Sequence, residues 1–241
     1  MRRTNFYPVI ILAAAVLFIT DCMTAEKSKA FRESPIALVS VVSNMDINWK
    51  DEKPVDPNVI SRSTRRAMEE DPDKGFMTKA DTIIDDVEAL IMSSLASSTN
   101  IMPRENVLRS RSYNEARINS HQEKGGMAKP EGYRFVNFRD KKFFSGFNAE
   151  TGTGKFLFIT LDLTKVMSAG FSKIGNYRAA IIMSVMIIDE RGRTQFNKKY
   201  EVFGRDQSKV SVGIYSQTEL RQMLLSAVSD ACYNFLDDIT F

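Results

Sequence analysis

The chain has 241 residues and a formal net charge of +3, with one histidine and two cysteines. This nearly balanced charge gives no reason to expect nucleic acid as a partner, because phosphate recognition depends on a basic excess. So few histidines and cysteines exclude a histidine-rich metal site and a scaffold stapled by several disulfides. A hydrophobic core must therefore hold the fold, and the length suits one domain.

Residues 1–25 have the three parts of an export signal: a positive start, an apolar run and small residues. The apolar run, residues 9–19, is too short to span a bilayer. A peptidase that requires small residues would cut after Ala25, whereas a lipoprotein peptidase would cut before Cys22 and leave it acylated. Asp21 directly before the cysteine argues against the second route. We expect export to the bacterial periplasm, as a plainly secreted protein or one lipid-anchored to the outer membrane at Cys22.

The first half of the exported chain alternates predicted strands and helices. The apolar, β-branched run at residues 36–42 predicts a strand covered on both faces. Mixed charge and three prolines at residues 50–75 predict an exposed, mobile insertion. Apolar residues at helical spacing over 80–95 predict an amphipathic helix. A short strand at 99–103 and a second helix at 103–117 follow it.

The second half begins with a glycine-rich stretch at residues 119–155, which predicts loops around one strand at 133–138. Three strands are predicted next, at residues 155–163, 177–190 and 194–203. Ser216 and Glu219 form a capping box that opens the clearest helix of the chain. These elements predict one α/β (α+β) domain over residues 34–241, with a mixed sheet flanked by helices and a C-terminal meander closed by a helix.

The residues that could take part in catalysis or bind a cofactor lie in separate parts of the sequence. The stretch ETGTGKF at residues 150–156 is similar to a phosphate loop, but Ala149 and Phe156 stand where a glycine and a hydroxyl residue are required. His121 and Cys232 could form a dyad, yet a loop histidine and a core cysteine explain them more simply. The acidic runs on the predicted helices fit a solvated face. We expect no catalytic residue, no cofactor and no metal.

The predicted second helix carries the most concentrated positive charge. Its arginines are Arg104, Arg109, Arg111 and Arg117. They are candidates for binding an acidic partner, and ordinary exposed arginines balanced by nearby acids are the alternative.

The order of elements resembles a group of bacterial envelope lipoproteins. The resemblance is carried by IALVSVV, DTIIDDVEALIMSSLASS, NIMPRENVLRSRSYNEAR, AAIIMSVMIIDERGRTQFNKKYEVFG and ELRQMLLSAVSDACYNFL, in that order. The group includes the curli-secretion lipoprotein, the penicillin-binding-protein activator lipoprotein and the N-terminal domain of the Tol–Pal translocation protein. The resemblance implies an anticodon-binding-domain-like fold.

The absence of a catalytic constellation favours a non-enzymatic envelope protein that binds another envelope component or its own copies. The alternative is an envelope enzyme or transporter accessory protein that acts on a glycan or small ligand. The sequence departs from the group in its long insertion at residues 50–75 and in lacking a channel-forming hairpin. Neither pore formation nor any functional residue is therefore carried over.

Overall fold

A six-stranded mixed sheet organises the protein. The computed structural model describes residues 33–50, 62–171 and 173–240. The sheet consists of β1 (Ile36–Ser43), β2 (Asn48–Trp49), β4 (Lys155–Phe171), β5 (Ile174–Asp189), β6 (Thr194–Phe203) and β7 (Ser208–Val210). Its main path runs β1-β4-β5-β6, with β2 paired to β4 and β7 paired to β5. The strands β1 and β2 run parallel to β4, and the other pairs are antiparallel.

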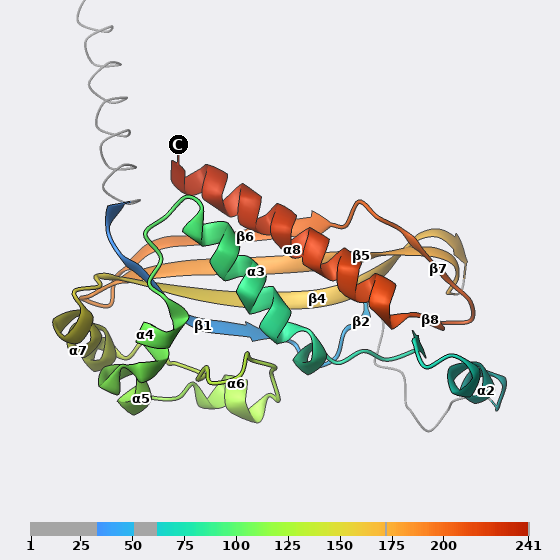
Figure 1. Ribbon diagram of the computed structural model, residues 1–241, viewed down its shortest axis with the longest axis horizontal. Helices are drawn as coiled ribbons and strands as arrows, with labels where there is room; N and C mark the ends of the chain where they lie inside the picture. The colour runs from blue at the N-terminus through green and yellow to red at the C-terminus, as the bar shows by residue number, and fades with distance from the viewer. Residues whose placement is uncertain (1–32, 51–61, 172, 241) are drawn as a thin grey trace, which may run out of the picture.

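Helices and a small second sheet surround this sheet. The helices are α2 (Arg62–Glu70), η2 (Ala80–Thr82), α3 (Ile84–Ala96), α4 (Arg104–Arg109), α5 (Arg111–Glu115), α6 (Ser120–Lys124), α7 (Lys141–Thr151) and α8 (Gln217–Thr240). The second sheet pairs β3 (Lys74–Gly75) with β8 (Tyr215–Ser216). In Figure 1, α3 and α8 cross one face of the main sheet, while α4, α5 and α7 lie at the end where β1 begins. The predicted mixed α/β class is confirmed.

Two hydrophobic clusters form the core, one on each face of the sheet. The larger cluster joins α3 and α8 to the sheet and includes Leu38, Leu161 and Leu224. The smaller cluster lies against α4, α5 and α7 and includes Val39 and Phe144. Because consecutive residues of a strand point to opposite faces, β1 contributes to both clusters and is buried at every position. The predicted strand covered on both faces is therefore confirmed.

The strongly patterned elements match their predictions, although the two long strands extend further. The strands β4 and β5 pair along almost their whole length, up to Phe171 opposite Ile174. The backbone N–H of Glu219 donates to Ser216 Oγ over 3.1 Å, so the predicted cap of α8 is present. The predicted short strand at 99–103 is reduced to one parallel bridge between Ile101 and Ile36.

The loop-rich prediction for residues 119–155 is wrong in part, because α6 and α7 lie within it. The three buried phenylalanines of α7 pack on the smaller core cluster. Asp140 caps this helix by accepting from the N–H of Phe143 over 3.2 Å, and Gly152 ends it at φ 72°. The expected strand at 133–138 is also absent from the described structure there, where Val136 forms one bridge to Ile118.

Two other predicted segments differ from the structure. The second helix is divided at Ser110, whose extended backbone separates α4 from α5. The break is held by Glu150, which accepts from the N–H groups of Arg111 and Ser112 over 2.9 and 3.0 Å. Within the predicted insertion, residues 62–70 form α2, where an ion pair of 2.8 Å between Arg66 and Glu70 stabilises successive turns. Charge spacing supports this helix where apolar periodicity is weak.

Several predictions concern residues outside those described. The export signal at 1–25, the lipidation candidate Cys22 and residues 51–61 of the insertion all lie there. Among the described helices, none has the length and apolar composition needed to cross a membrane.

Candidate functional site

Arg104, the first of the four predicted binding arginines, is held in a structural cluster. Its Nε lies 3.7 Å from Glu88 Oε2, and its guanidinium stacks 5.7 Å from the centre of the Tyr133 ring. Tyr133 Oη donates to Glu88 Oε1 over 3.0 Å. Burial raises the pKa of Glu88, which is 5% exposed, while the hydrogen bond from Tyr133 and the charge of Arg104 oppose that rise. Arg104 thus partly offsets the cost of burying the Glu88 carboxylate.

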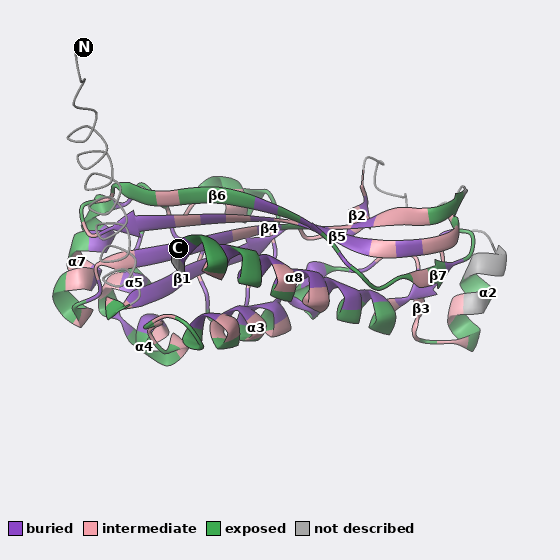
Figure 2. Cartoon of the chain, turned by 90° about the horizontal axis from the view of Figure 1, so that it is seen from above, coloured by how far each residue is buried: buried purple, intermediate pink, exposed green. Residues whose placement is uncertain are grey.

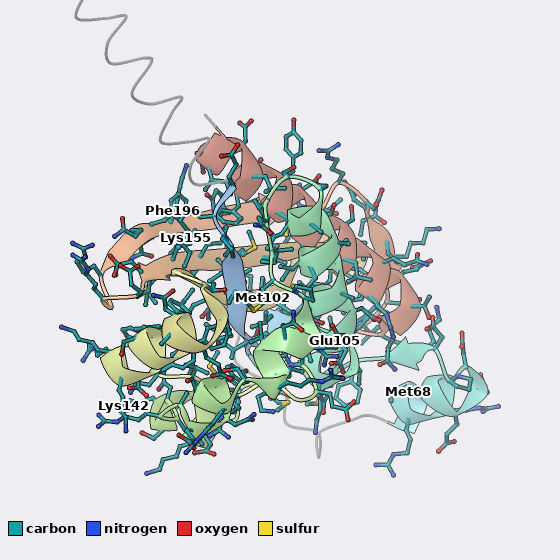
Figure 3. The ribbon with its side chains drawn as sticks, turned by 60° about the vertical axis from the view of Figure 1, so that its left-hand side comes forward. Met68, Met102, Glu105, Lys142, Lys155 and Phe196 are labelled. Atoms are coloured by element: carbon teal, nitrogen blue, oxygen red, sulfur yellow. The ribbon has the colours of Figure 1, made fainter. Side chains whose placement is uncertain are left out.

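The other three arginines do not form one basic patch. Arg111 pairs with Glu115 over 2.7 Å along α5. Arg109 borders a hollow of about 330 Å³ that Glu150 also lines. Arg117 borders a separate hollow of about 320 Å³ beside Lys142, and acidic side chains line that hollow too. Figure 3 shows Lys142 on α7. Each arginine thus has acidic neighbours, and the binding of an acidic partner by these four residues stays a prediction.

The other candidate groups are separated in the fold. Cys232 is buried in the larger core cluster, where burial raises the pKa of its thiol to about 12. His121 lies exposed on the short helix α6. Glu150 of the stretch that is similar to a phosphate loop caps α5 by accepting from the N–H groups of Ser112 and Arg111 and from Ser110 Oγ. These hydrogen bonds lower its pKa to about 2. No group of three or more potential metal ligands occurs in the described parts of the chain.

A buried lysine that the sequence analysis missed lies toward the turn between β4 and β5. We call this end of the sheet, where β2, β3, β7 and β8 gather, the distal end (Figure 1 and Figure 2). Lys165 is 1% exposed, and its Nζ donates to the carbonyl oxygen of Ile47 and, over 3.0 Å, to Tyr215 Oη. The amine also lies 5.6 Å from the centre of the Trp49 ring and 4.5 Å from that of Tyr215. Burial lowers the pKa of Lys165 to about 7.

Hydrogen bonds extend this aromatic cluster across the distal end. Tyr215 Oη is 3.0 Å from Thr78 Oγ1, and Tyr177 Oη donates to the carbonyl oxygen of Ser216 over 3.3 Å. Because protein encloses the Lys165 amine, a substrate has no access to it, and the lysine holds β2, β4 and β8 together. Strand alternation is the signal that could have found it, since Lys165 shares its side of β4 with the buried leucines.

An apolar surface lies beside this cluster, at the outside of the distal end. Two large apolar side chains are exposed there: Ile174 is 54% and Val212 67% exposed. Next to them is a hollow of about 610 Å³ between the end of α2 and the β5–β7 pair, with Val210 and Ile214 in its wall. We call the two exposed side chains and this hollow the distal surface.

The backbone of the distal surface is held in an unusual conformation. Val212 has φ 53°, which is a true outlier for a β-branched residue. Two hydrogen bonds of 3.0 Å fix the loop around it, from Ser211 N to the Ile214 carbonyl and from Gly213 N to the Lys173 carbonyl. The surrounding structure therefore maintains a backbone strain that presents an apolar side chain to solvent.

A second accessible region lies along β6, the edge strand of the sheet. The odd-numbered residues from Asn197 to Phe203 are exposed, whereas Tyr200 and Val202 are buried toward α8. Figure 2 shows β6 coloured mostly as exposed, with α3 and α8 on one side of the sheet.

Comparison with solved structures finds matches to two lipoproteins. The chain matches the LpoB C-terminal domain of Salmonella enterica at 10% identity and a TM-score of 0.31, covering 75% of this chain and 94% of that one. It matches lipoprotein GNA1162 of Neisseria meningitidis at 13% identity and a TM-score of 0.28, covering 83% and 99%. LpoB is a penicillin-binding-protein activator lipoprotein, which is one of the group that the sequence resembles, and GNA1162 is a lipoprotein. At these TM-scores they carry no argument about function. Neither a model of a known protein family nor a curated protein matches the chain.

Proposed function

We propose that this chain is an exported protein of the bacterial cell envelope that acts by binding another envelope protein through its distal surface. The observation that carries the proposal is the pair of exposed apolar side chains, Ile174 and Val212, beside the apolar hollow. Apolar side chains gathered at one place on a surface are typical of interaction sites. The proposal also rests on the export signal and the resemblance to envelope lipoproteins.

The strain at Val212 supports this role. A side chain other than glycine in the left-handed region costs about 1 kcal/mol or more, and asparagine is tolerated there better than valine. Folding alone would favour asparagine or glycine at this position, whereas valine supplies apolar contact area. Strain of this kind is found preferentially at binding and switch sites.

The charged rim of the hollow is balanced, with Glu70 and Asp71 on one side and Lys74 and Lys209 among the other lining residues. A partner therefore needs an apolar segment and no strong excess of either charge. A protruding loop or helix end with one or two large apolar residues fits this description.

Substitution of Val212 separates binding from stability. We expect Val212→Asn to leave the free energy of unfolding unchanged or to raise it by up to about 1 kcal/mol, because the strain falls. The same change should weaken binding, because it removes an apolar contact. Tyr233→Asn is the matched control, since Tyr233 is 71% exposed on α8, away from the distal surface.

The binding test uses a photo-crosslinking amino acid at position 212 or 233 in cells that export the full chain. We expect a discrete crosslinked envelope protein from position 212 and a weaker or different pattern from position 233. Val212→Asn should reduce recovery of that same protein when the crosslinker is placed at Ile174. Equal crosslinking from both positions would contradict the proposal.

A small ligand is the second candidate for the distal surface, as in the transporter-accessory alternative. The volume of about 610 Å³ is in the range of small-molecule sites. Native mass spectrometry of the protein purified from envelopes distinguishes the two, since a retained small molecule adds only its own small mass, whereas a protein partner adds the mass of a whole polypeptide chain.

A further inference from the structure

Among the described residues, the outer edge of β6 is a free edge of the sheet. The strand pairs with β5 on one side, and in the described structure no strand pairs with its other side. Gly204 N donates to the Ala179 carbonyl over 2.8 Å, and this pair lies next to the pair of Ala180 with Phe203. Gly204 and the even-numbered residues before it therefore turn their backbone N–H and C=O groups toward β5. Backbone groups alternate sides along a strand. The odd-numbered residues from Asn197 to Phe203 therefore turn their N–H and C=O groups to the outer edge.

The side chains at these outward positions carry one charge of each sign. Lys199 and Glu201 are both exposed, and Lys199 has no ion pair with another described residue. Glu201 Oε1 accepts from Lys50 Nζ over 2.5 Å, and a carboxylate can accept several donors at once. The strand thus presents a Lys and a Glu two residues apart on one face, which is a self-complementary pattern.

We propose that two copies of this chain associate by pairing their β6 edges antiparallel about a two-fold axis at Tyr200. In this register Lys199 of each copy lies opposite Glu201 of the other, and Asn197 lies opposite Phe203. A two-fold axis at Lys199 would place two lysines opposite each other, and an axis at Glu201 would do the same with two glutamates. Like charges directly opposite across strands are unfavourable, so the charges select the axis at Tyr200.

The second lysine of the edge does not oppose this pairing. Lysines on edge strands commonly prevent association, but Lys198 points to the α8 side, where its Nζ contacts both oxygens of Asp238 over 2.7 and 2.6 Å. Tyr200 Oη donates to the same carboxylate over 2.6 Å. The charge of Lys198 is therefore already neutralised within its own copy.

The interface is short, since it covers residues 197–203 of each strand. We therefore expect a weak dimer, with a dissociation constant of about 1 µM or higher. This association goes beyond the distal surface and does not use it, so either proposal can fail without the other.

Charge exchange between Lys199 and Glu201 tests the proposed register by sedimentation velocity. We expect Lys199→Glu and Glu201→Lys each to abolish the dimer, because each variant alone places like charges opposite. The double variant should dimerise as wild type does. An equimolar mixture of the two single variants should also associate, because every opposed pair then joins Lys to Glu. Far-UV circular dichroism shows whether each variant is folded.

Amide hydrogen exchange by NMR supplies an independent measurement on wild type. The N–H groups of the outward residues, Lys199 and Glu201 among them, should exchange several-fold more slowly at dimeric than at monomeric concentrations. Those of Tyr200 and Val202, which already bond to β5, should change little. A wild-type chain that stays monomeric up to about 200 µM would overturn the proposal. A dimer unaffected by the charge reversals would do so as well.

Discussion

Replacement of Lys165 by methionine tests the buried cluster of the distal end most directly. The pKa of this lysine falls from 10.5 to about 7 in the folded protein. Each pKa unit corresponds to about 1.4 kcal/mol, so holding the protonated amine in the fold costs about 5 kcal/mol more than holding the neutral amine. In the unfolded chain the amine keeps its ordinary pKa.

The sign of the pH dependence follows from proton uptake. Between pH 10.5 and 7 the unfolded chain binds a proton at Lys165 that the folded chain does not. The contribution of this group to the free energy of unfolding therefore falls as the pH is lowered through that window, and it is constant below the folded pKa. From pH 10 to pH 7 the expected loss is roughly 3 kcal/mol.

Methionine removes this titration but also removes the hydrogen bond to the Ile47 carbonyl. An unpaired buried acceptor costs about 1–3 kcal/mol at every pH. We expect Lys165→Met to be more stable than wild type near pH 7, and its advantage to shrink by roughly 3 kcal/mol as the pH is raised to 10.

Urea denaturation at several pH values measures this difference. Trp49 is the only tryptophan of the chain and lies against Lys165, so its fluorescence reports on the distal end, and far-UV circular dichroism reports on the whole fold. The control is Lys124→Met, at an exposed lysine of α6, which should follow wild type at each pH. If the stabilities of Lys165→Met and wild type change in parallel from pH 7 to 10, the lysine keeps its charge in the fold and the reasoning is refuted.

Three further outcomes are expected. Leu224→Ala should lower the free energy of unfolding by about 2–5 kcal/mol in urea denaturation, because a fully buried leucine leaves a cavity; a loss below about 0.5 kcal/mol would show that α8 is not docked. Asp73→Ala should cost about 0.5–2 kcal/mol, because its carboxylate accepts from the N–H of Thr218 over 2.9 Å at the start of α8. The hydroxyl groups of Ser216 and Thr218 also donate to this carboxylate, and these hydrogen bonds lower the pKa of Asp73, so the difference from wild type should disappear as the pH falls below the usual carboxyl range. Mass spectrometry of the native protein should find a chain that starts at Glu26, or at Cys22 with added acyl mass; a chain that starts at Met1 would contradict export.

Elements with a strong local pattern could be predicted from the sequence. The apolar run of β1, the alternation of β4 to β6 and the periodicity of α8 each reflect burial that depends on spacing along the chain. The helix α7 was missed because glycines and lysines surround Phe143, Phe144 and Phe147, and their burial depends on the smaller core cluster. The division of α4 from α5 depends on Glu150, which lies far along the chain.

The distal end could not be predicted because its contacts join distant segments. Lys165 bonds to Ile47 and Tyr215, which lie 118 and 50 residues away along the chain. Asp73 caps a helix 145 residues further on. The spacing of residues within a short stretch of sequence contains no information on contacts between residues so far apart in the chain. The arginines were identified by their density in the sequence, but their acidic partners, such as Glu88 beside Arg104, appear only in the folded protein.

The direction of β6 determines where the two distal surfaces lie in the proposed dimer. The start of β1 pairs with the start of β4, at the end of the sheet opposite the distal surface. Antiparallel pairing of β6 turns the two copies end to end, so a dimer carries one distal surface at each of its ends. Partner proteins that bind the distal surface would therefore meet a dimer at its two ends, and a charge-reversed monomer at one end only.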